Sequence, residues 1–189
     1  MSLKIISGKF GSRPLVSPKG IQTRPTTAMA RKALFDMCQE MIEEAHVLDL
    51  FAGSGAIGLE ALSLGASSAV FVEKSRLALD AIGKNIDLLN VEKNCRILAK
   101  EALGAVTLLE KEGETFDLIY SDPPYEMPLD PILKALDTSS LLKPEGRLFI
   151  ESNKQAPDCE LKNLILKNSR RFGICFLHQY RLKSINSST

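Results

Sequence analysis

The segment from Leu48 to Leu62, LDLFAGSGAIGLEAL, joins an apolar stretch to a helical one through a glycine-rich loop. Within it, GSGAIG has the spacing G-x-G-x-x-G, which lets the backbone approach a ligand closely at the N-terminus of a helix. The stretch before the loop, 46–51, has the pattern of a buried strand, and the helix after it is expected to end at Gly65. A strand, a glycine loop and a helix in this order are typical of sites for adenosine-containing cofactors.

Further apolar stretches follow the glycine loop and alternate with helix patterns. The predicted strands are 68–73, 94–98, 116–122 and 146–152. The predicted helices are 102–111, 129–139 and one capped by Ser75, with Leu79, Ile82, Ile86 and Leu89 on one apolar face. Because strands that alternate with helices at this spacing form parallel sheets, we predict an α/β fold with helices on both faces. Residues 164–182 leave no room for a helix and predict an antiparallel hairpin at the sheet edge.

Residues 1–25 differ from the rest of the chain, because glycines and prolines interrupt them and their apolar residues fall in short pieces. We predict a small hairpin arm there, followed by one compact domain over 26–189. A helix is predicted from a cap at Thr26 or Thr27 to about Glu44. Its residues at i+4 steps are expected to fill the core, and they are Met29, Ala33, Met37 and Met41.

Charge is distributed unevenly along the chain, although the net charge is only +1. Residues 1–35 carry +7 and no acidic side chain, residues 36–153 carry −11, and residues 154–189 carry +5. A basic arm and a basic tail around an acidic body favour contact with a polyanion. For the tail alone, a solvated surface is the simpler interpretation.

The cysteines and histidines do not suggest a metal or disulfide site. The chain has four cysteines without C-x-x-C spacing and two histidines far apart, so we expect no metal centre and no disulfide framework. No apolar run approaches the ~20 residues that span a bilayer, and the N-terminus lacks the apolar core of a signal peptide. These features predict a reduced, cytoplasmic protein without a membrane partner.

Two acidic residues near the glycine loop distinguish between adenosine cofactors. Glu73 lies at the carboxyl end of the second strand, where a carboxylate can accept hydrogen bonds from both ribose hydroxyls. Asp49, just before the loop, would repel a pyrophosphate but suits the sulfonium and ammonium groups of S-adenosyl-L-methionine. The chain also has little room for a separate hydride-acceptor domain, so S-adenosylmethionine is favoured over NAD.

The predicted cofactor contacts extend over three strand ends. Glu101 and the Ala102 N–H lie where an adenine edge would bind, although a solvated acid in the first turn of a helix explains Glu101 equally well. The residues expected to bind the cofactor are Asp49, Phe51, Ala52, Gly53, Ser54, Gly55, Glu73, Lys74, Glu101, Ala102 and Asp122.

The sequence SDPPY, Ser121 to Tyr125, follows the fourth predicted strand, at the edge where open α/β sheets place their sites. Pro123 and Pro124 remove two backbone donors, so this turn presents acceptors, to which Asp122 adds a carboxylate. Tyr125 adds a flat face for stacking. Such a set fits the exocyclic amine of a flipped nucleobase, whose methylation would depend on positioning and electrostatics. The alternative is a rigid turn with a packed tyrosine.

These motifs resemble a known family. DLFAGSG, Glu73 and DPPY resemble class I S-adenosylmethionine-dependent methyltransferases that modify exocyclic amines. KIISGKFGSRPL followed by RPTTAMARKALFDM is similar to the RsmD family, which methylates N2 of a guanine in bacterial 16S rRNA. The resemblance implies a Rossmann-like, seven-stranded sheet with an antiparallel last strand and an N-terminal hairpin near the active site. It also implies RNA or cofactor contacts, for which our candidates are Lys9, Arg13, Arg24, Thr26 and Arg31.

Two positions depart from the family pattern. Phe10-Gly11 replaces a bulky Trp-Arg pair in the arm, which leaves the arm's RNA contacts open, and Tyr125 replaces a common Phe, which preserves stacking. The expected partner is 16S rRNA or the 30S subunit, and a monomer would suffice. The alternatives are a DNA adenine-N6 methyltransferase, a protein glutamine-N5 methyltransferase, an NAD oxidoreductase and a non-catalytic rRNA-binding factor.

Overall fold

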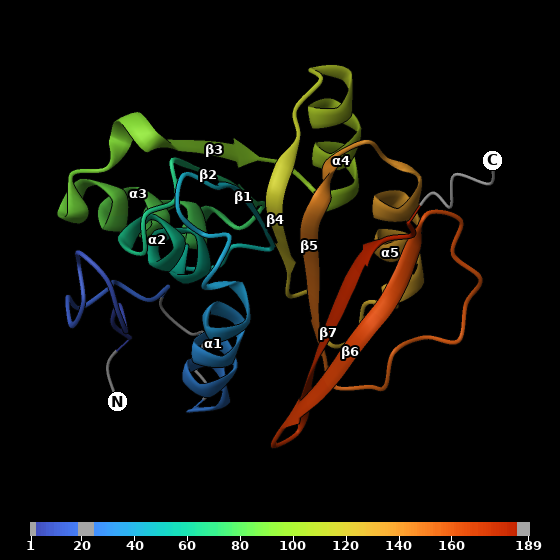
Figure 1. The fold of residues 1–189 in the computed structure, drawn as a ribbon. Helices are drawn as coiled ribbons and strands as arrows, with labels where there is room; N and C mark the ends of the chain where they lie inside the picture. The colour runs from blue at the N-terminus through green and yellow to red at the C-terminus, as the bar shows by residue number, and fades with distance from the viewer. Residues whose placement is uncertain (1–2, 19–24, 185–189) are drawn as a thin grey trace.

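The computed structural model describes residues 3–18 and 25–184 of the chain. Seven strands form one sheet in the order β3-β2-β1-β4-β5-β7-β6 (Figure 1). The strands are β1 His46–Leu50, β2 Ser68–Glu73, β3 Cys95–Ala99, β4 Phe116–Ser121, β5 Leu142–Ser152, β6 Leu164–Phe172 and β7 Cys175–Leu182. The pairs among β1 to β5 are parallel, and β7 runs antiparallel to both β5 and β6. The α/β class, the mostly parallel sheet and its antiparallel last strand are confirmed.

Helices cover both faces of the sheet, as the alternation of patterns predicts. They are α1 Pro25–Cys38, α2 Ala56–Ser63, α3 Arg76–Leu89, α4 Ala102–Lys111 and α5 Leu129–Thr138, with a short 3-10 helix η1 at Glu92–Asn94. One apolar core joins α1, α2 and α3 to one face, and a second core joins α4 and α5 to the other. Among the described residues, no helix combines the length and the apolar character needed to cross a membrane.

Helix α3 follows the predicted apolar face closely. Ile82, Ile86 and Leu89 are buried, and Leu79 is half-buried at the border of that face. Ser75 occupies the cap position, although its side chain makes no capping hydrogen bond. The apolar period therefore places α3 on the sheet without help from a capping side chain.

The predictions for α1 are wrong in three respects. The helix begins at Pro25, a residue favoured in the first helical position, so Thr26 and Thr27 lie inside its first turn. It ends at Cys38 rather than near Glu44, because the chain turns there and the Met41 N–H bonds to the Cys38 carbonyl.

The third error concerns which face of α1 is buried. Ala30, Leu34 and Cys38 are at most 3% exposed and form the row that faces the core. The row of methionines begins one residue earlier, so it is turned by about 100° around the helix axis from the buried row. It therefore lies at the border of the contact with the core. Met29 is 67% exposed, whereas Met37 and Met41 are partly buried and pack against the core as expected.

The arm folds back on itself and packs on α2 and α3. The Ile5 N–H bonds to the Arg13 carbonyl, and Lys4 and Pro14 form an antiparallel bridge. Ile5, Phe10 and Leu15 belong to the core on the α1 side of the sheet. The predicted boundary at residue 25 adjoins residues 19–24, which lie outside the described part of the chain.

Candidate active site

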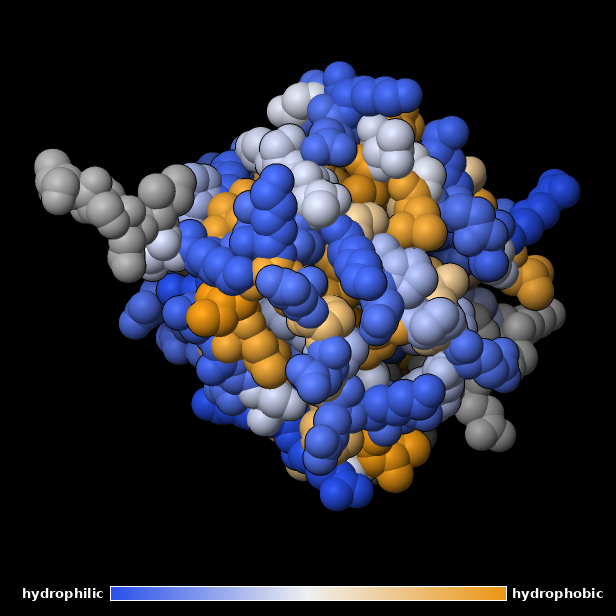
Figure 2. Space-filling model, turned by 90° about the vertical axis from the view of Figure 1, so that its right-hand side faces the viewer, coloured by the Kyte–Doolittle hydropathy of each residue, from blue (hydrophilic) through white to orange (hydrophobic). Residues whose placement is uncertain are grey.

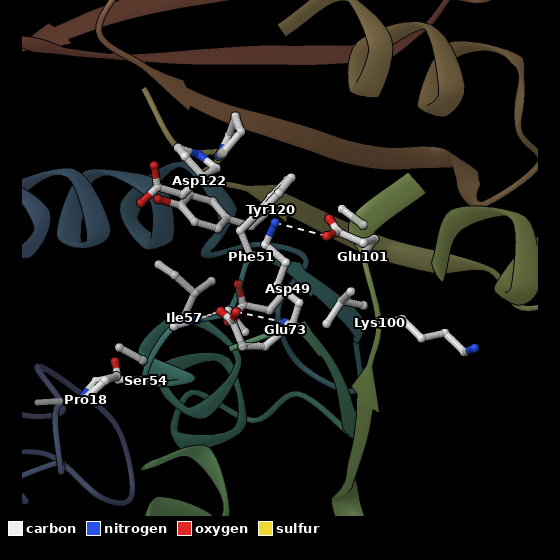
Figure 3. Close-up of a pocket in the computed structure, with 18 of the residues that line it drawn as sticks. Pro18, Asp49, Phe51, Ser54, Ile57, Glu73, Lys100, Glu101, Tyr120 and Asp122 are labelled. Atoms are coloured by element: carbon white, nitrogen blue, oxygen red, sulfur yellow. Dashed lines mark hydrogen bonds and ion pairs between the residues drawn. The ribbon is translucent and has the colours of Figure 1, made fainter. Parts of the chain in front are cut away.

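A cavity of about 460 Å³ opens at the edge of the sheet where β1, β2, β3 and β4 end. Its volume lies within the range of roughly 300–1,000 Å³ that is common for small-molecule sites. Leu3 and Pro18 line it from the arm, and Arg31 lines it from α1. The ends of β1, β2 and β4, the loops after the four strands and the starts of α2 and α4 supply the rest (Figure 3). The cavity therefore lies between the arm and the carboxyl end of the sheet.

The glycine loop turns at the base of this cavity. Gly53 has a φ of 57°, and its N–H donates to Oε2 of Glu73 at 2.9 Å. The other carboxylate oxygen of Glu73 accepts from the N–H groups of Lys74 and Ser75 at 2.8 and 2.9 Å. A carboxylate has about four acceptor sites, so Glu73 is oriented by the backbone and can still accept from a ligand.

The three glycines of the fingerprint serve different purposes. A Cβ on Gly53 would meet nothing within 4 Å, so its absence leaves open space on the cavity side. A Cβ on Gly55 or Gly58 would lie 3.2 or 2.4 Å from Cε1 of Phe71. These two glycines let α2 pack closely against β2, and Gly55 does not line the cavity.

Asp49 lies beneath the loop and is 1% exposed. Its Oδ2 accepts a hydrogen bond from the Gly58 N–H at 3.1 Å. Burial raises the pKa of Asp49 to about 7, and the negative charge of Glu73 adds to this shift. Asp49 and Glu73 face the same cavity (Figure 3), so a bound cation would relieve the electrostatic cost of ionising Asp49.

The side of the cavity where adenine is predicted to bind is more exposed to solvent than the base around Asp49. Lys74 Nζ and Glu101 Oε1 form an ion pair at 3.0 Å, and both side chains are more than half exposed. Ala102 is buried at the start of α4. Lys100 also lines the cavity, but its side chain points away from the other residues drawn (Figure 3).

The loop after β4 brings the predicted catalytic residues to the same cavity. Asp122, Pro123, Pro124 and Tyr125 all line it. The Asp122 N–H lies 3.4 Å from the Leu50 carbonyl, which ties the start of this loop to the end of β1. The Tyr125 hydroxyl lies 3.4 Å from Sγ of Cys175, at the start of β7. The structure thus joins the glycine loop and the SDPPY turn in one site.

A buried pair that sequence reasoning missed adjoins this turn. The Tyr120 hydroxyl donates to Oε2 of Glu151 at 2.7 Å, and Tyr120 also lines the cavity. Burial and the nearby carboxylates raise the pKa of Tyr120 well above its usual value, so it remains a hydrogen-bond donor. The two residues lie on neighbouring strands, and nothing in either strand's apolar pattern marks them as partners.

A second buried network joins the arm to the site. Glu60 of α2 accepts hydrogen bonds from the N–H groups of Ile6 and Ser7 at 2.7 to 3.0 Å. Arg31 Nε lies 3.5 Å from Glu60 Oε2, and Arg31 Nη2 donates to the Lys4 carbonyl at 2.6 Å. Arg31 is 5% exposed, so the structure places it beside the cavity rather than on the surface of the arm.

The other candidate RNA contacts lie elsewhere. Lys9 and Arg13 are exposed and flank the Phe10 ring, with Lys9 Nζ and Arg13 Cζ 5.4 and 5.7 Å from its centroid. Neither lines the cavity. Arg24 and the side chain of Thr26 lie outside the described part of the chain.

Comparison with known proteins identifies the family to which the chain belongs. A family model described as "Conserved hypothetical protein 95" matches residues 3–181. "Ribosomal RNA small subunit methyltransferase D" of Escherichia coli K12 is 33% identical over 79% of this chain and 74% of its own length. The chain belongs to this family. It is the RsmD family that the arm motif, the glycine loop and DPPY resemble.

Relatives of the RsmD family match nearly the whole chain. The protein of the same name from Haemophilus influenzae is 27% identical over 95% of this chain and 93% of its own length. The solved structure of a "hypothetical protein" from Thermus thermophilus has a TM-score of 0.81 at 30% identity. It covers 95% of this chain and 99% of that one. The predicted Rossmann-like methyltransferase fold is confirmed.

Proposed function

We propose that the protein transfers the S-methyl group of S-adenosyl-L-methionine to the exocyclic N2 amine of a guanine in 16S rRNA. The observation that carries this proposal is the single cavity shared by Asp49, Glu73 and the Asp122–Tyr125 turn. The names of the relatives support rRNA as the substrate. Guanine N2 rests on the family that the arm motif and DPPY resemble.

The residues at the base of the cavity fit this cofactor. Glu73, fixed by three backbone N–H groups, would accept a hydrogen bond from a ribose hydroxyl at its remaining acceptor site, and Asp49 would lie toward the cationic groups. The space beside Gly53 admits a ligand close to the backbone. Further contacts are proposed for Phe51, Ala52, Ser54, Lys74, Glu101 and Ala102. When bound, the cofactor supplies an electrophilic methyl group on a positively charged sulfur.

The turn after β4 would hold the amine. Asp122 and the Pro123 carbonyl would accept the two amine N–H groups, and Tyr125 would stack on the base. With both N–H groups held, the nitrogen lone pair is directed at the methyl carbon. The new N–C bond would form as the S–C bond breaks, with the bonding electrons left on the sulfur, and Asp122 or water would then accept the proton that the amine loses.

The RNA would approach over the arm. Lys9 and Arg13 are exposed there, and Arg24 and Thr26 precede or begin α1. Arg31 would act at the cavity wall, which it lines while its guanidinium contacts Glu60 and the Lys4 carbonyl. We also propose that the protein acts as a cytoplasmic monomer without a stable protein partner.

The proposal is tested with methyl-labelled S-adenosylmethionine and three acceptors, namely naked 16S rRNA, 30S subunits lacking the modification, and duplex DNA. Label should enter at least one RNA acceptor and not DNA. Asp122→Ala should abolish transfer and largely keep cofactor binding, whereas Glu73→Ala should weaken cofactor binding. Glu126→Ala, an exposed acid next to the turn, is the matched control and should leave transfer unchanged. Label in DNA alone, or normal turnover by Asp122→Ala, would contradict the proposal.

A further inference from the structure

The turn of the β6–β7 hairpin lies beside the catalytic loop. Phe172 at the end of β6 pairs with Cys175 at the start of β7, and Cys175 Sγ lies 3.4 Å from the Tyr125 hydroxyl. The hairpin projects beyond the ends of the neighbouring strands (Figure 1). Residues near this turn are therefore at the same edge of the sheet as the cavity.

Positive charge gathers on this hairpin without acidic residues. Residues 162–184 contain six Lys or Arg side chains and no Asp or Glu. Arg170 and Arg171 are exposed near the turn, and exposed Lys154 follows β5 at the same end, where Ser152 pairs with Phe176. No ion pair between described residues uses any of these three cations. Figure 2 shows the side of the molecule that lies at the right in Figure 1, which is largely hydrophilic with apolar patches between.

Arg171 is held in a defined position. Its Nε–H donates to the Gly173 carbonyl at 2.9 Å, and its Cζ lies 5.6 Å from the centroid of the Phe176 ring. That ring stacks on His178 with a 9° interplanar angle, and His178 is fixed by Ser169 and the Lys154 carbonyl. Because the bond to Gly173 uses Nε, the Nη edge can form a bidentate contact with a phosphate.

The arm lines the cavity directly, whereas the hairpin reaches it only through its contact with Tyr125. Leu3 and Pro18 of the arm line the cavity, and so does Tyr125, which contacts the hairpin. A guanine in this cavity would carry flanking nucleotides past both elements, since its own backbone continues in two directions. Two basic surfaces would then bind the phosphates on the two sides of the target nucleotide.

We propose that Lys154, Arg170 and Arg171 form a second RNA-binding surface, separate from the arm, which binds backbone phosphates next to the target nucleotide. The inference rests on the proposed function for the identity of the nucleic acid. It assigns a role to the basic tail. From composition alone, the simpler interpretation of this tail is a solvated surface. The exposed cations at the hairpin turn are the observation that changes this interpretation.

The test compares Arg170→Ala/Arg171→Ala with wild type in binding to a 16S rRNA fragment over a range of salt concentrations. The matched control, Lys93→Ala/Lys111→Ala, removes two exposed charges. Lys93 precedes the start of β3 and Lys111 precedes the start of β4, so both lie at the strand ends away from the cavity. The hairpin variant should bind roughly tenfold more weakly, and its salt slope should fall by about 1 to 2. The control should keep the wild-type slope, and both variants should keep the wild-type cofactor affinity and melting temperature.

An unchanged salt slope in the hairpin variant would overturn the inference. A loss of affinity for 30S subunits with unchanged affinity for naked RNA would also overturn it, because the surface would then contact a ribosomal protein. Binding is measured independently of methyl transfer. Failure of the wild-type protein to methylate RNA would therefore contradict the proposed function without deciding whether this surface binds RNA.

Discussion

The backbone N–H of Gly58 donates to Oδ2 of Asp49 at 3.1 Å, and this bond ties a buried carboxylate to the helix that follows the glycine loop. Burial raises the pKa of Asp49 to about 7, so near neutral pH the ligand-free protein holds this group close to its midpoint. A cationic ligand stabilises the ionised form. The charge state of Asp49 therefore links cofactor affinity to pH.

We predict that S-adenosylmethionine binds more tightly as the pH rises from about 6 to about 8. Asp49 must release a proton to attract the cation, and this release is complete only above its pKa of about 7. Calorimetric titration at pH 6, 7 and 8 measures the effect. Asp49→Asn is the control, because the ligand's own amine titrates equally in both proteins. If both showed the same pH dependence, Asp49 would not be the group responsible.

Asp49→Asn should also stabilise the ligand-free protein above pH 7. The folded state holds the Asp49 proton up to about pH 7, whereas the unfolded chain releases it near the ordinary aspartate pKa of 3.8. Stability from this group is therefore present at low pH and is lost as the pH rises through 7, by at most about 4 kcal/mol. The variant's gain in melting temperature should be larger at pH 8 than at pH 5. An equal gain at both values would point to packing instead.

Much of the site could be predicted because its residues follow strand ends at fixed offsets. Asp49, Glu73 and Asp122 come from three parallel strands, whose carboxyl ends meet at one edge of the sheet. The topology alone therefore brings them together, and the sequence shows where each strand ends. The antiparallel hairpin was predictable for a related reason, since the segment is too short to include a crossover helix.

The parts that the sequence did not indicate depend on how distant elements rotate against each other. Arg31 and Glu60 lie on different helices, and only the packing of α1 beside α2 makes them partners. Tyr120 and Glu151 lie on β4 and β5, and only the pairing of these two strands in the sheet makes them partners. The buried face of α1 was misassigned because its methionine and alanine row is as regular as the row that is buried.

The close contact of α2 with β2 predicts a large effect of one methyl group. In Gly58→Ala the new Cβ would lie 2.4 Å from the Phe71 ring, so α2 or the ring must move. We expect a loss of roughly 1–3 kcal/mol in the free energy of unfolding. Gly83→Ala in α3 is the matched control, because its Cβ meets nothing within 4 Å. The control should be stabilised by up to about 1 kcal/mol.

Urea unfolding of both variants measures these changes. Equal effects in the two variants would mean that helix propensity, rather than the contact with Phe71, decides the stability at Gly58.

The Arg31–Glu60 pair predicts a structural role for a residue that the family resemblance places near the cofactor or the RNA. Arg31→Met leaves Glu60 buried without its cation and should cost roughly 3–5 kcal/mol at neutral pH. Burial already raises the pKa of Glu60, so Glu60 protonates readily. The loss of stability in Arg31→Met should therefore become smaller as the pH falls. Lys9→Ala and Arg13→Ala should change stability by less than about 0.5 kcal/mol. Thermal unfolding between pH 5 and 8 gives all three results, and a pH-independent loss in Arg31→Met would contradict the ionic interpretation.

Asn85 of α3 joins the arm to the glycine loop. Its Oδ1 accepts from the Val16 N–H at 2.7 Å, and its Nδ2 donates to the carbonyls of Val16 and Ser54, both at 2.9 Å. The side chain is fully buried, so no water replaces these bonds when it is removed. We predict that Asn85→Ala weakens cofactor binding and RNA binding together, because it loosens the loop and the arm at once.

Asn85→Asp should be at least as damaging, since a carboxylate cannot donate to the Ser54 and Val16 carbonyls. Asp87→Ala, an exposed change on the same helix, is the control and should leave both affinities unchanged. Calorimetry with S-adenosylmethionine and salt-dependent RNA binding measure the two effects. A variant that lost RNA affinity but kept wild-type cofactor affinity would show that the arm is positioned independently of the glycine loop.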